Sequence, residues 1–359
     1  MLKTKTLNKY ILVETAYSVI TVFIIFLIIL SSNTMMRLIE EASVGNFPTY
    51  LLLPTIIIKI TQYSIYIIPV SLFFGIILSL GKLYNNNEMA VIFSSGVSPN
   101  DIARILASVI LPVSLIVALF TLYLTPIASE YRYKLEHRLK NEERVDNIKP
   151  GKFNTSASGT STFFVEKLTN NLMEGVFINL IKDQYTQETV ETSKTAKYSI
   201  DNKDRKFIVL NNGSIHEMVG NNEIRITRYR EHAIQLSQEL PDYINSRSIA
   251  KSTYNLFFST RIEDKAELQA RLFLPLAAMI LGFIAIPLSY SAPKKGKYDK
   301  IFLAAIFYFL YFVSISIAKK MYILGYTPSI FGIWWIHIIV LLLLLYFYNL
   351  DENKIPIRN

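Results

Sequence analysis

The stretch LFLPLAAMILGFIAIPLSY, residues 272–290, contains no charged side chain and decides the class of this protein. Two further uncharged stretches follow it, at residues 301–318 (IFLAAIFYFLYFVSISIA) and 329–348 (SIFGIWWIHIIVLLLLLYFY). An α-helix rises about 1.5 Å per residue, so about 20 apolar residues cross a hydrocarbon core about 30 Å thick. Each of these stretches is therefore predicted to be a membrane-spanning helix.

Three more spans are predicted closer to the N-terminus, at residues 12–31, 50–80 and 102–128. Each of them contains a single charged side chain. The first span follows a basic start and could be a signal peptide, but its apolar run is too long and no small-residue cleavage site follows it, so we expect a retained helix. The sequence thus predicts an α-helical membrane protein with six spans in two groups of three.

The composition of the whole chain fits this class and excludes several others. The chain has 359 residues, of which 51% are apolar and only 18% are charged, against roughly 25% charged residues in a typical soluble protein. It contains no cysteine, which excludes disulfides, cysteine zinc sites and iron–sulfur clusters. The Gly-Lys pairs at Gly81, Gly151 and Gly296 lack the Ser or Thr of a phosphate-binding loop. No cofactor is therefore expected in this chain.

The distribution of Lys and Arg gives the predicted orientation in the membrane. If the N-terminus is cytoplasmic, the cytoplasmic short loops and tails receive Lys3, Lys5, Lys9, Lys82, Arg104, Lys294, Lys295, Lys297, Lys300, Lys354 and Arg358. Basic residues collect on the cytoplasmic side of membrane proteins. Both termini are therefore predicted to be cytoplasmic and the polar block between the two groups of spans to be outside. The net charge of +9 beside apolar spans favours a membrane over nucleic acid as partner.

The polar block, residues 131–265, carries the signals of β-strands after a helix-like start that ends near Pro150-Gly151. Strands are predicted at residues 162–165, 176–181, 207–210 and 223–230. The turn residues Asn211-Asn-Gly213 follow the third of these. We therefore expect an all-β domain, a sandwich or an open barrel, between membrane segments 1–130 and 266–359.

A short helix is predicted in the cytoplasmic loop between the second and third spans, at about residues 85–96. Glu88 stands near its start, Gly96 is a typical C-terminal stop, and Ser98-Pro99 caps the following span. Two interpretations are open. The helix rests on the lipid surface, or it docks a cytoplasmic motor, in which case the coupling residues are Glu88, Met89, Val91, Ile92 and Phe93.

Five basic residues fall on the outer-leaflet side of the predicted spans: Arg37, Lys59, Arg271, Lys319 and Lys320. Such side chains commonly extend to the lipid head groups. Alternatively, they surround a cavity that binds a phosphorylated ligand. Lys59 favours the second interpretation most, because it lies about 13 Å along its helix and a charge at that depth is costly.

Several stretches, in this order and spacing, resemble the LptF/LptG (YjgP/YjgQ) family of lipopolysaccharide export permeases, and the F branch more than the G branch. They are Arg37-Leu-Ile with Gly45, Pro69-Val-Ser-Leu-Phe-Phe-Gly75, Leu80-Gly-Lys-Leu-Tyr84 with Glu88, Gly151-Lys-Phe153 with Phe164-Val-Glu166, and Ala266-Glu-Leu-Gln-Ala-Arg271 with Ile286-Pro-Leu-Ser289. The resemblance covers essentially the whole chain.

The resemblance implies a fold and a set of partners. The inserted domain would be a periplasmic β-jellyroll, with the spans in a Gram-negative inner membrane. The chain would pair with a homologous permease, LptG, above two LptB ATPase subunits that bind ATP and Mg²⁺, and would work with LptC and LptA. Glu88 matches the family's coupling helix, Arg37 matches an arginine that contacts lipopolysaccharide, and Arg271 is a second contact by position. Lys59 departs from the family's small or apolar residue.

Two other functions remain open at this point. A secondary transporter would show repeated or interrupted charged helices at the midplane, and the sequence has no such symmetry. An adaptor that senses an extracytoplasmic ligand would need a cytoplasmic output domain, and the longest predicted cytoplasmic segment is only about 20 residues, near one span's length. Co-purification with an ATPase separates both from an ATP-driven extractor.

Overall fold

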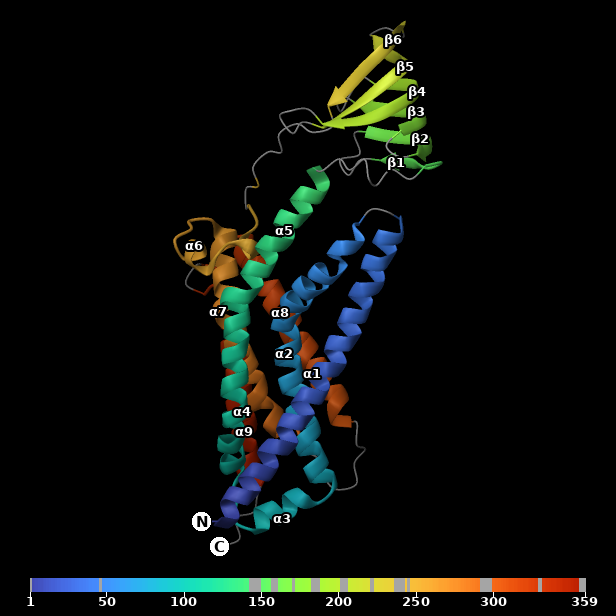
Figure 1. Cartoon of the computed structure of the whole chain (residues 1–359). Coiled ribbons are helices and arrows are strands. Elements are labelled where there is room, and N and C mark those ends of the chain that lie inside the picture. Colours follow the sequence, from blue (N-terminus) through green and yellow to red (C-terminus); the bar gives the residue numbers. More distant parts are fainter. Residues whose placement is uncertain are drawn as a thin grey trace. The chain divides into compact units, whose positions relative to one another are not determined.

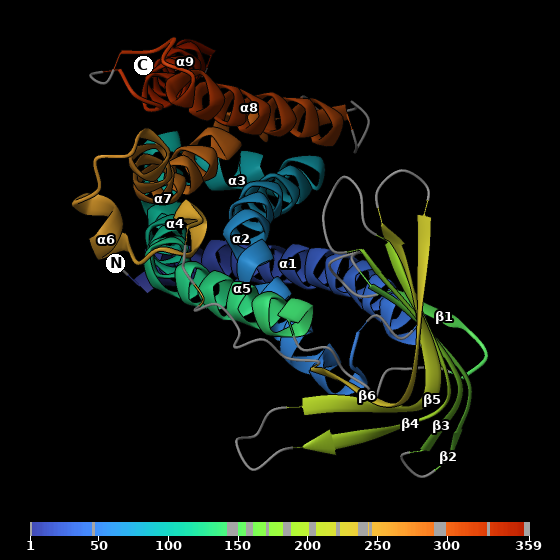
Figure 2. The same ribbon diagram turned by 90° about the horizontal axis from the view of Figure 1, so that it is seen from above.

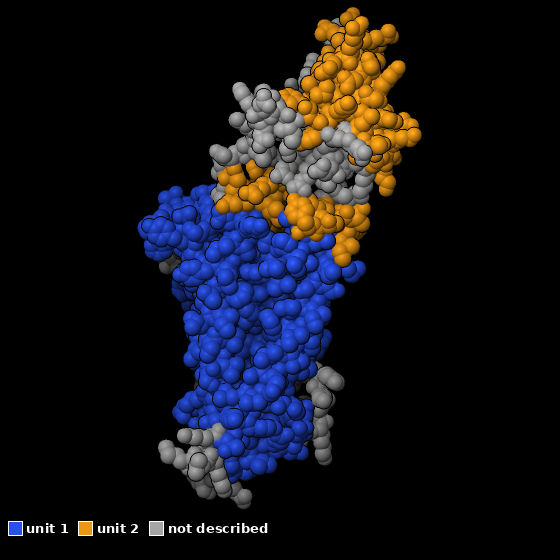
Figure 3. All heavy atoms as spheres, viewed as in Figure 1, with its two compact units in different colours: residues 1–38, 51–131, 245–359 blue, residues 39–50, 132–244 orange. Residues whose placement is uncertain are grey.

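The computed structural model describes most of the chain (Figure 1). The described residues are 2–44, 47–141, 150–155, 161–169, 172–181, 188–200, 206–219, 223–235, 243, 246–290, 299–328 and 331–354. The chain divides into two compact units, coloured separately in Figure 3. Unit 1 consists of residues 1–38, 51–131 and 245–359, and unit 2 consists of residues 39–50 and 132–244.

Helices make up unit 1 and reach into unit 2 at two places. Their bounds are α1 Leu2–Val44, η1 Thr49–Leu51, α2 Leu52–Asn85, α3 Glu88–Ser94, α4 Pro99–Leu119, η2 Phe120–Leu124, α5 Thr125–Asn141, η4 Ser248–Ala250, α6 Thr253–Phe257, α7 Ile262–Leu288, α8 Asp299–Ile323 and α9 Trp335–Lys354. The segment η2 is a π-helical turn, through which α4 continues into α5. Prolines lie inside α2, α4 and α7 without ending them.

Five of the described helices are long and apolar enough to cross a membrane. They are Thr6–Ser43, Thr49–Asn85, Pro99–Leu139, Ile262–Leu288 and Ile301–Ile323. Each corresponds to a predicted span, so the helical membrane class is confirmed. The helices are longer than the apolar runs because segments that contain charged residues continue them beyond the hydrocarbon region, as Met35 to Val44 does in α1 with Arg37, Glu40 and Glu41.

The sixth predicted span differs from the others. It was placed at residues 329–348, whereas helix α9 begins at Trp335, and its apolar described part, Trp335–Tyr346, is shorter than a full span. Residues 331–334 form turns instead. Gly332 has a φ of +45° and packs against the side chain of Gln269, and the amide of Ile333 donates to Oε1 of Gln269 at 2.9 Å. These contacts hold the chain against α7 and delay the start of the helix.

The core of unit 1 lies where α2, α4 and α7 pack against one another. Leu72, Phe73 and Ile76 of α2 are fully buried there, together with Ile110 of α4 and Leu281 of α7. The surfaces of α1 and α8 are different, since large apolar side chains such as Ile28 and Phe309 are exposed on them. A helix that is apolar on its exposed face is suited to contact with lipid or with another apolar helix.

Unit 2 contains an all-β domain, as predicted. Its strands are β1 Phe153–Thr155, β2 Ser161–Thr169, β3 Leu172–Ile181, β4 Glu188–Ile200, β5 Lys206–Val219 and β6 Glu223–Gln235. Over the described residues, the expected jellyroll is one six-stranded sheet in which every strand pairs antiparallel with the next along the chain. Four strands match the predicted positions, whereas the three-residue β1 and the mostly polar β4 were missed.

A bend crosses strands β2 to β6 of the sheet along one row of residues. In each of these strands one residue has no Cα partner in the register of the neighbouring strands, and these residues would be partners if the pairing were continuous. They are Glu166 of β2, Gly175 of β3, Lys194 of β4, Asn212 of β5 and Arg230 of β6. Gly175 and Asn212 have φ values of +61° and +55°, and the curvature is visible in Figure 2. A left-handed residue changes the direction of a strand, so the two halves of the sheet face each other.

The bend also changes which side chains face inward. Met173 and Val176 are three residues apart, so in a regular strand they would point to opposite faces. Both are buried in the same cluster, which also contains Val165, Ile178, Ala196, Ile208 and Leu210. The bend therefore gives one sheet an apolar interior, which normally requires two separate sheets.

The predicted turn at Asn211-Asn-Gly213 was wrong. These residues lie inside β5, which continues to Val219. Asn212 adopts the left-handed conformation that a turn would need, but here this conformation bends the strand. A side chain at Gly213 would collide with the ring of Tyr229 and with the backbone of Thr192. Turn-forming residues here bend a strand without reversing it.

Candidate functional site

The short helix predicted between the second and third spans is present as α3, which lies between α2 and α4, and its coupling role stays a prediction. It begins at Glu88, after Asn87 in the left-handed conformation with a φ of +60°, and it ends at Ser94 before Gly96, whose φ is +90°. Ser98 and Asp101 then cap each other at the start of α4, as the sequence predicted for Ser98. These local signals fix a helix of two turns between two spans.

The five predicted coupling residues point in different directions. Met89 and Ile92 are buried in the core of unit 1, whereas Val91 is 70% exposed. Phe93 is half-buried, and its ring lies 6.5 Å from the ring of Tyr84. Only one side of α3 is therefore open to a partner, and Val91 is the large apolar side chain on it.

Glu88 faces the membrane unit's own helices. Its Oε2 accepts a hydrogen bond from the hydroxyl of Tyr10 at 2.6 Å, and its Oε1 accepts from Nδ2 of Asn86 at 3.0 Å. The hydroxyl of Tyr10, followed by the amide of Asn86, holds the pKa of the Glu88 carboxyl below its usual range. One residue of α1 thus contacts the start of α3. Sequence reasoning missed Tyr10, because nothing in the pattern pairs residues 78 positions apart.

The five predicted lipid-binding cations do not form one ring. Arg37 and Lys320 are exposed, and Lys59 is half-buried. Lys319 and Arg271 are brought together by one carboxylate, since Lys319 Nζ lies 2.5 Å from Oε2 of Glu267 and Arg271 Nε lies 3.2 Å from its Oε1. The structure thus separates three cations that face outward from two that share an internal partner.

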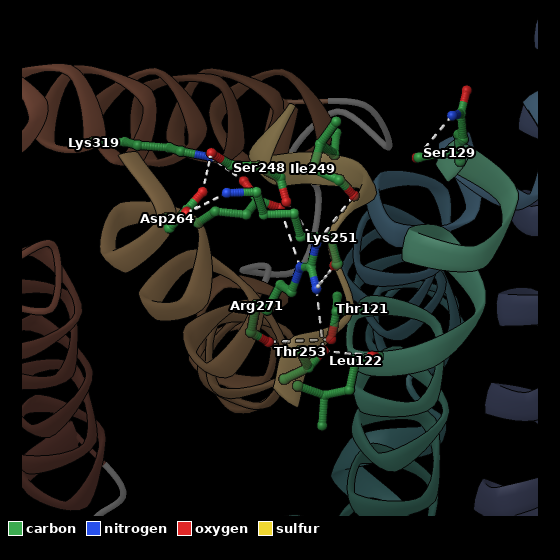
Figure 4. Close-up of polar contacts among 12 residues, drawn as sticks. Thr121, Leu122, Ser129, Ser248, Ile249, Lys251, Thr253, Asp264, Arg271 and Lys319 are labelled. Carbon is green, nitrogen blue, oxygen red and sulfur yellow. Dashed lines mark hydrogen bonds and ion pairs between the residues drawn. The ribbon is translucent and has the colours of Figure 1, made fainter. Parts of the chain in front are cut away.

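Arg271 is engaged by the protein itself (Figure 4). Its side chain is only 3% exposed. Nη1 donates to the carbonyl of Lys251 at 2.9 Å and to the hydroxyl of Thr253 at 3.1 Å, and Nη2 donates to the carbonyls of Ser248 and Ile249 at 3.2 and 3.0 Å. A guanidinium has five N–H donors in a fixed fork, and this geometry suits several carbonyls of one loop. Arg271 therefore holds the segment that precedes α7.

A second buried charge completes this polar cluster. Asp264 of α7 has no exposed surface, and its carboxylate accepts from Ser248 Oγ at 2.5 Å, Ser259 Oγ at 2.6 Å and Lys251 Nζ at 2.6 Å. Both carboxylate oxygens therefore have partners, which buried charges require. The sequence signal that could have identified the cluster is the helical spacing of Glu267 and Arg271, four residues apart.

The cluster also contacts the π-helical turn of the α4–α5 rod. The hydroxyl of Thr253 donates to the carbonyl of Leu122 at 2.6 Å, and the hydroxyl of Thr121 donates to the carbonyl of Arg271 at 3.1 Å. A π-turn frees backbone carbonyls from the regular helical pattern, and side chains can then bind them. The residues before α7 and the end of α4 are thus tied together.

Lys320 stands beside an apolar hollow on α8. The hollow has a volume of about 500 Å³. It is lined by Tyr308, Phe309, Phe312, Val313, Ser316, Ile317 and Lys320. A cation at the end of an apolar surface matches a molecule that carries a negative group on hydrocarbon chains. Among the described residues no group of three or more His, Asp or Glu side chains could hold a metal ion.

One polar contact lies inside the bent sheet. Glu191 of β4 is 98% buried, and its Oε1 lies 2.7 Å from Nδ1 of His232 on β6. These two residues come from opposite sides of the bend, because the row of Lys194 and Arg230 separates them. The ring of Tyr229 lies 5.3 Å from that of His232, and burial raises the pKa of its phenol, as does a hydrogen bond with Glu191. The contact joins the two halves of the sheet.

Comparison with known proteins agrees with this architecture. The family described as "Lipopolysaccharide export system permease LptF/LptG" matches residues 9–349. A protein of Escherichia coli (strain K12) named "Lipopolysaccharide export system permease protein LptF" is 22% identical over 361 residues, which cover 98% of this chain and 96% of that protein. Proteins of the same name from Escherichia coli O157:H7 and Shigella flexneri show the same identity and coverage.

Proposed function

The chain belongs to the LptF/LptG family of lipopolysaccharide export permeases, and from this we propose that it is the membrane-spanning subunit of an ATP-driven lipopolysaccharide extractor. Membership gives a role in lipopolysaccharide export, as a multi-pass membrane subunit that is not itself a catalyst. The remaining parts of the proposal concern the energy source, the path of the lipid and the partners.

The observation that carries the ATP-driven part of the proposal is the position and exposure of α3. A helix of seven residues stands between two spans, with Met89 and Ile92 anchored in the core and Val91 exposed. A helix anchored in this way moves together with the spans on either side of it. We infer that a cytoplasmic ATPase, LptB, which binds ATP and Mg²⁺, pushes on the exposed side.

The lipid path begins at the cations that face outward. Lipopolysaccharide carries phosphates on a sugar head group that also bears acyl chains, so it needs charge-assisted contacts beside an apolar surface. Arg37, Lys59 and Lys320 are available for the phosphates, and the hollow beside Lys320 offers apolar surface for the chains. Lys319 and Arg271 both contact Glu267 of the chain itself. Narrowing of the membrane cavity would then move the lipid toward the apolar interior of the bent sheet.

The partners and the location follow from the family. The chain would pair with the homologous permease LptG and with two LptB subunits, in the inner membrane of a Gram-negative bacterium. Both termini would be cytoplasmic and the β-domain periplasmic, where LptC and LptA would receive the lipid. Exposed apolar side chains on the edge strand β6, among them Ile224 and Ile226, give a surface that suits such a transfer.

The first test is purification of the tagged chain in mild detergent with mass spectrometry of bound protein and lipid. We expect a homologous permease, a small ATPase and lipopolysaccharide. Val91→Asp should lower recovery of the ATPase, because a charge on the exposed side of α3 disrupts an apolar contact. Recovery of the unmodified chain alone with ordinary phospholipid would overturn the ATP-driven proposal.

The second test measures coupling in proteoliposomes. Glu88→Ala should leave the complex assembled and hydrolysing ATP while lipopolysaccharide release falls. Glu41→Ala, which removes an exposed carboxylate at the far end of α1, is the matched control and should resemble the unmodified chain. Equal release from the Glu88 and Glu41 variants would show that the Glu88 carboxylate has no part in coupling.

A further inference from the structure

Helix α1 is joined by two polar contacts to the start of α3 and to the last turn of α2. The hydroxyl of Tyr10 donates to Glu88 at 2.6 Å, and one turn further along α1 the carboxylate of Glu14 lies 2.6 Å from Nζ of Lys82, at the end of α2. Tyr10 and Glu14 are four residues apart and so lie on one face of α1. Both contacts lie at the α3 end of unit 1, where Figure 1 shows α1 passing close to that helix.

Just beyond these contacts α1 crosses α2 closely. Ile11 is fully buried, the hydroxyls of Thr15 and Ser79 lie 3.0 Å apart, and Val19 meets Gly75. A β-carbon at Gly75 would collide with the backbone of Val19, so only glycine allows this approach. The contact points follow one another every four residues, which makes a single narrow line of contact ending near Val22.

The rest of α1 is packed much less tightly. Between Val22 and Thr34 no side chain is buried, and all residues of this stretch are described. Ile24, Ile25, Ile28 and Ile29 are each about half exposed, at 48%, 50%, 58% and 56%. The whole helix from Leu2 to Val44 contains neither proline nor glycine, so nothing in its sequence favours a kink. It is one rod, whose line of packed contacts lies near one end, and beyond Val22 only Thr34 and Leu38 of its described residues are buried.

We propose that α1 is a lever that carries movement of the coupling helix to the outer end of the membrane unit, with Tyr10 as the residue that positions one against the other. The proposal rests on the function proposed above. The close contact at Gly75 is the pivot. From Val19 to Tyr10 the rod measures about 14 Å, and from Val19 to Arg37 about 27 Å, at about 1.5 Å per residue.

The lengths of the two arms have a direct consequence. A displacement of α3 at Glu88 is carried to Arg37 enlarged about twofold, in the opposite direction across the pivot. The exposed isoleucines let the outer arm move, because only Thr34 and Leu38 are buried on that arm beyond Val22 and their contacts alone need to be broken. In this arrangement Glu88 acts on α1, while Val91 on the open side of α3 receives the push. The lever thereby connects the coupling residues to a lipid-binding cation.

The test uses Tyr10→Phe, which removes only the hydroxyl, in the full complex with its ATPase. Tyr17→Phe is the matched control, since Tyr17 lies on the same helix and is 66% exposed. The Tyr10 variant cannot donate its hydrogen bond to the charged Glu88 side chain, so its release of lipopolysaccharide per ATP should fall about threefold to tenfold. The control should match the unmodified complex, and ATP hydrolysis should continue in both.

A charge exchange tests the second contact. Glu14→Lys and Lys82→Glu place like charges together, so each alone should reduce release per ATP, and the double variant should restore most of it. A merely structural effect of either substitution would not be reversed by the other. Failure of the double variant to recover, together with normal coupling in Tyr10→Phe, would overturn the lever.

A distance measurement checks the movement itself. The chain contains no cysteine, so spin labels can be placed at Met36→Cys and Leu324→Cys without other labelled sites in this chain. Trapping the ATPase in its ATP-bound state should change the distance between the labels, and Tyr10→Phe should reduce that change at least twofold. An unaltered change in Tyr10→Phe contradicts the lever. If the unmodified complex releases no lipopolysaccharide with ATP, the proposed function fails instead, and the two failures are distinguishable.

Discussion

Replacement of Arg271 by leucine separates two roles for this residue, because it removes the guanidinium and keeps an apolar side chain of moderate size. If Arg271 chiefly held the loop before α7, the carbonyls of Ser248, Ile249 and Lys251 would lose their donor at a partly buried site. An unsatisfied buried polar group costs about 1–3 kcal/mol. Removing one partner of a buried ionic cluster costs about 3–5 kcal/mol. The losses at the separate carbonyls are not independent, so they are not added to this value.

The assay is thermal unfolding of the purified complex, combined with limited trypsin digestion. A loss of about 4 kcal/mol lowers the melting temperature of a unit of 150–250 residues by roughly 8 °C or more. The loop itself offers trypsin sites at Arg247, Lys251 and Arg261, which should be cut faster in the Arg271→Leu variant. Lys320→Leu, at an exposed position, is the control for loss of one positive charge and should leave both readouts unchanged.

Arg271→Lys sharpens the comparison. Lysine keeps the charge but has one nitrogen in place of a planar fork, so it cannot bind Ser248, Ile249 and Lys251 together. It should therefore be destabilised nearly as much as the leucine variant. The reasoning is refuted if both variants melt and digest like the unmodified complex while lipopolysaccharide binding is lost, because Arg271 would then be a ligand contact and not the support of the loop.

Three further predictions concern other parts of the chain. Gly175→Ala should destabilise the bent sheet by about 1–2 kcal/mol, because a side chain in the left-handed conformation is strained, and thermal unfolding of the complex measures this. The pKa of the Glu88 carboxyl is lowered in the folded protein. Its hydrogen bond with Tyr10 therefore contributes fully at a pH above the ordinary glutamate pKa of about 4.3. The contribution is lost as the pH falls through the lowered pKa of the folded protein. Crosslinking of α1 to α3 should accordingly be constant between about pH 6 and 8, and it should fall only at a pH below the ordinary glutamate pKa. His232→Leu removes one of the partners of the buried Glu191 carboxylate, which keeps Tyr229, and should cost about 1–3 kcal/mol, much of which the double variant with Glu191→Leu should recover in the same unfolding assay.

The helical class could be predicted from sequence because a bilayer imposes a simple requirement. Every spanning helix needs a long apolar run, and five of the predicted runs lie in such helices. Their ends could not be predicted in the same way, since beyond the hydrocarbon region polar residues also form helix. The start of α9 at Trp335 depends on Gln269, a residue more than 60 positions away, and no local pattern reports that contact.

The β-domain shows a different limit. Asn211-Asn-Gly213 has the residues of a hairpin turn, and the backbone does adopt a left-handed conformation at Asn212. Whether such a residue reverses a strand or bends it depends on the strands alongside. Here the irregular residues of five neighbouring strands stand in one row, and a shared bend gives all of them the same apolar interior. The preference of Asn212 for the left-handed conformation could be predicted from sequence, but its effect on the fold depends on all five neighbouring strands.

The candidate cations show why residue type alone did not settle the site. Arg37 and Arg271 looked equivalent in sequence, each placed at the outer end of a span. Burial separates them, because Arg37 is exposed and Arg271 is 3% exposed with its donors directed to the chain's own carbonyls. The buried residue had to be paired to be tolerated at all, whereas nothing internal requires the charge of Arg37.

The same distinction applies at the opposite end of the membrane unit, and it changes how mutations there should be interpreted. Glu88 is the charged residue of the coupling helix, so a loss of coupling in its variants would ordinarily be attributed to weaker binding of the motor. Its carboxylate instead contacts Tyr10 of α1, and Val91 is the exposed residue. A variant at Glu88 can therefore uncouple the complex while the motor stays bound, and one at Val91 should release the motor. Uncoupling with the motor bound at Glu88, and loss of the motor at Val91, would together place the affected step after motor binding. In the lever proposal this step is the movement of α1 about Gly75.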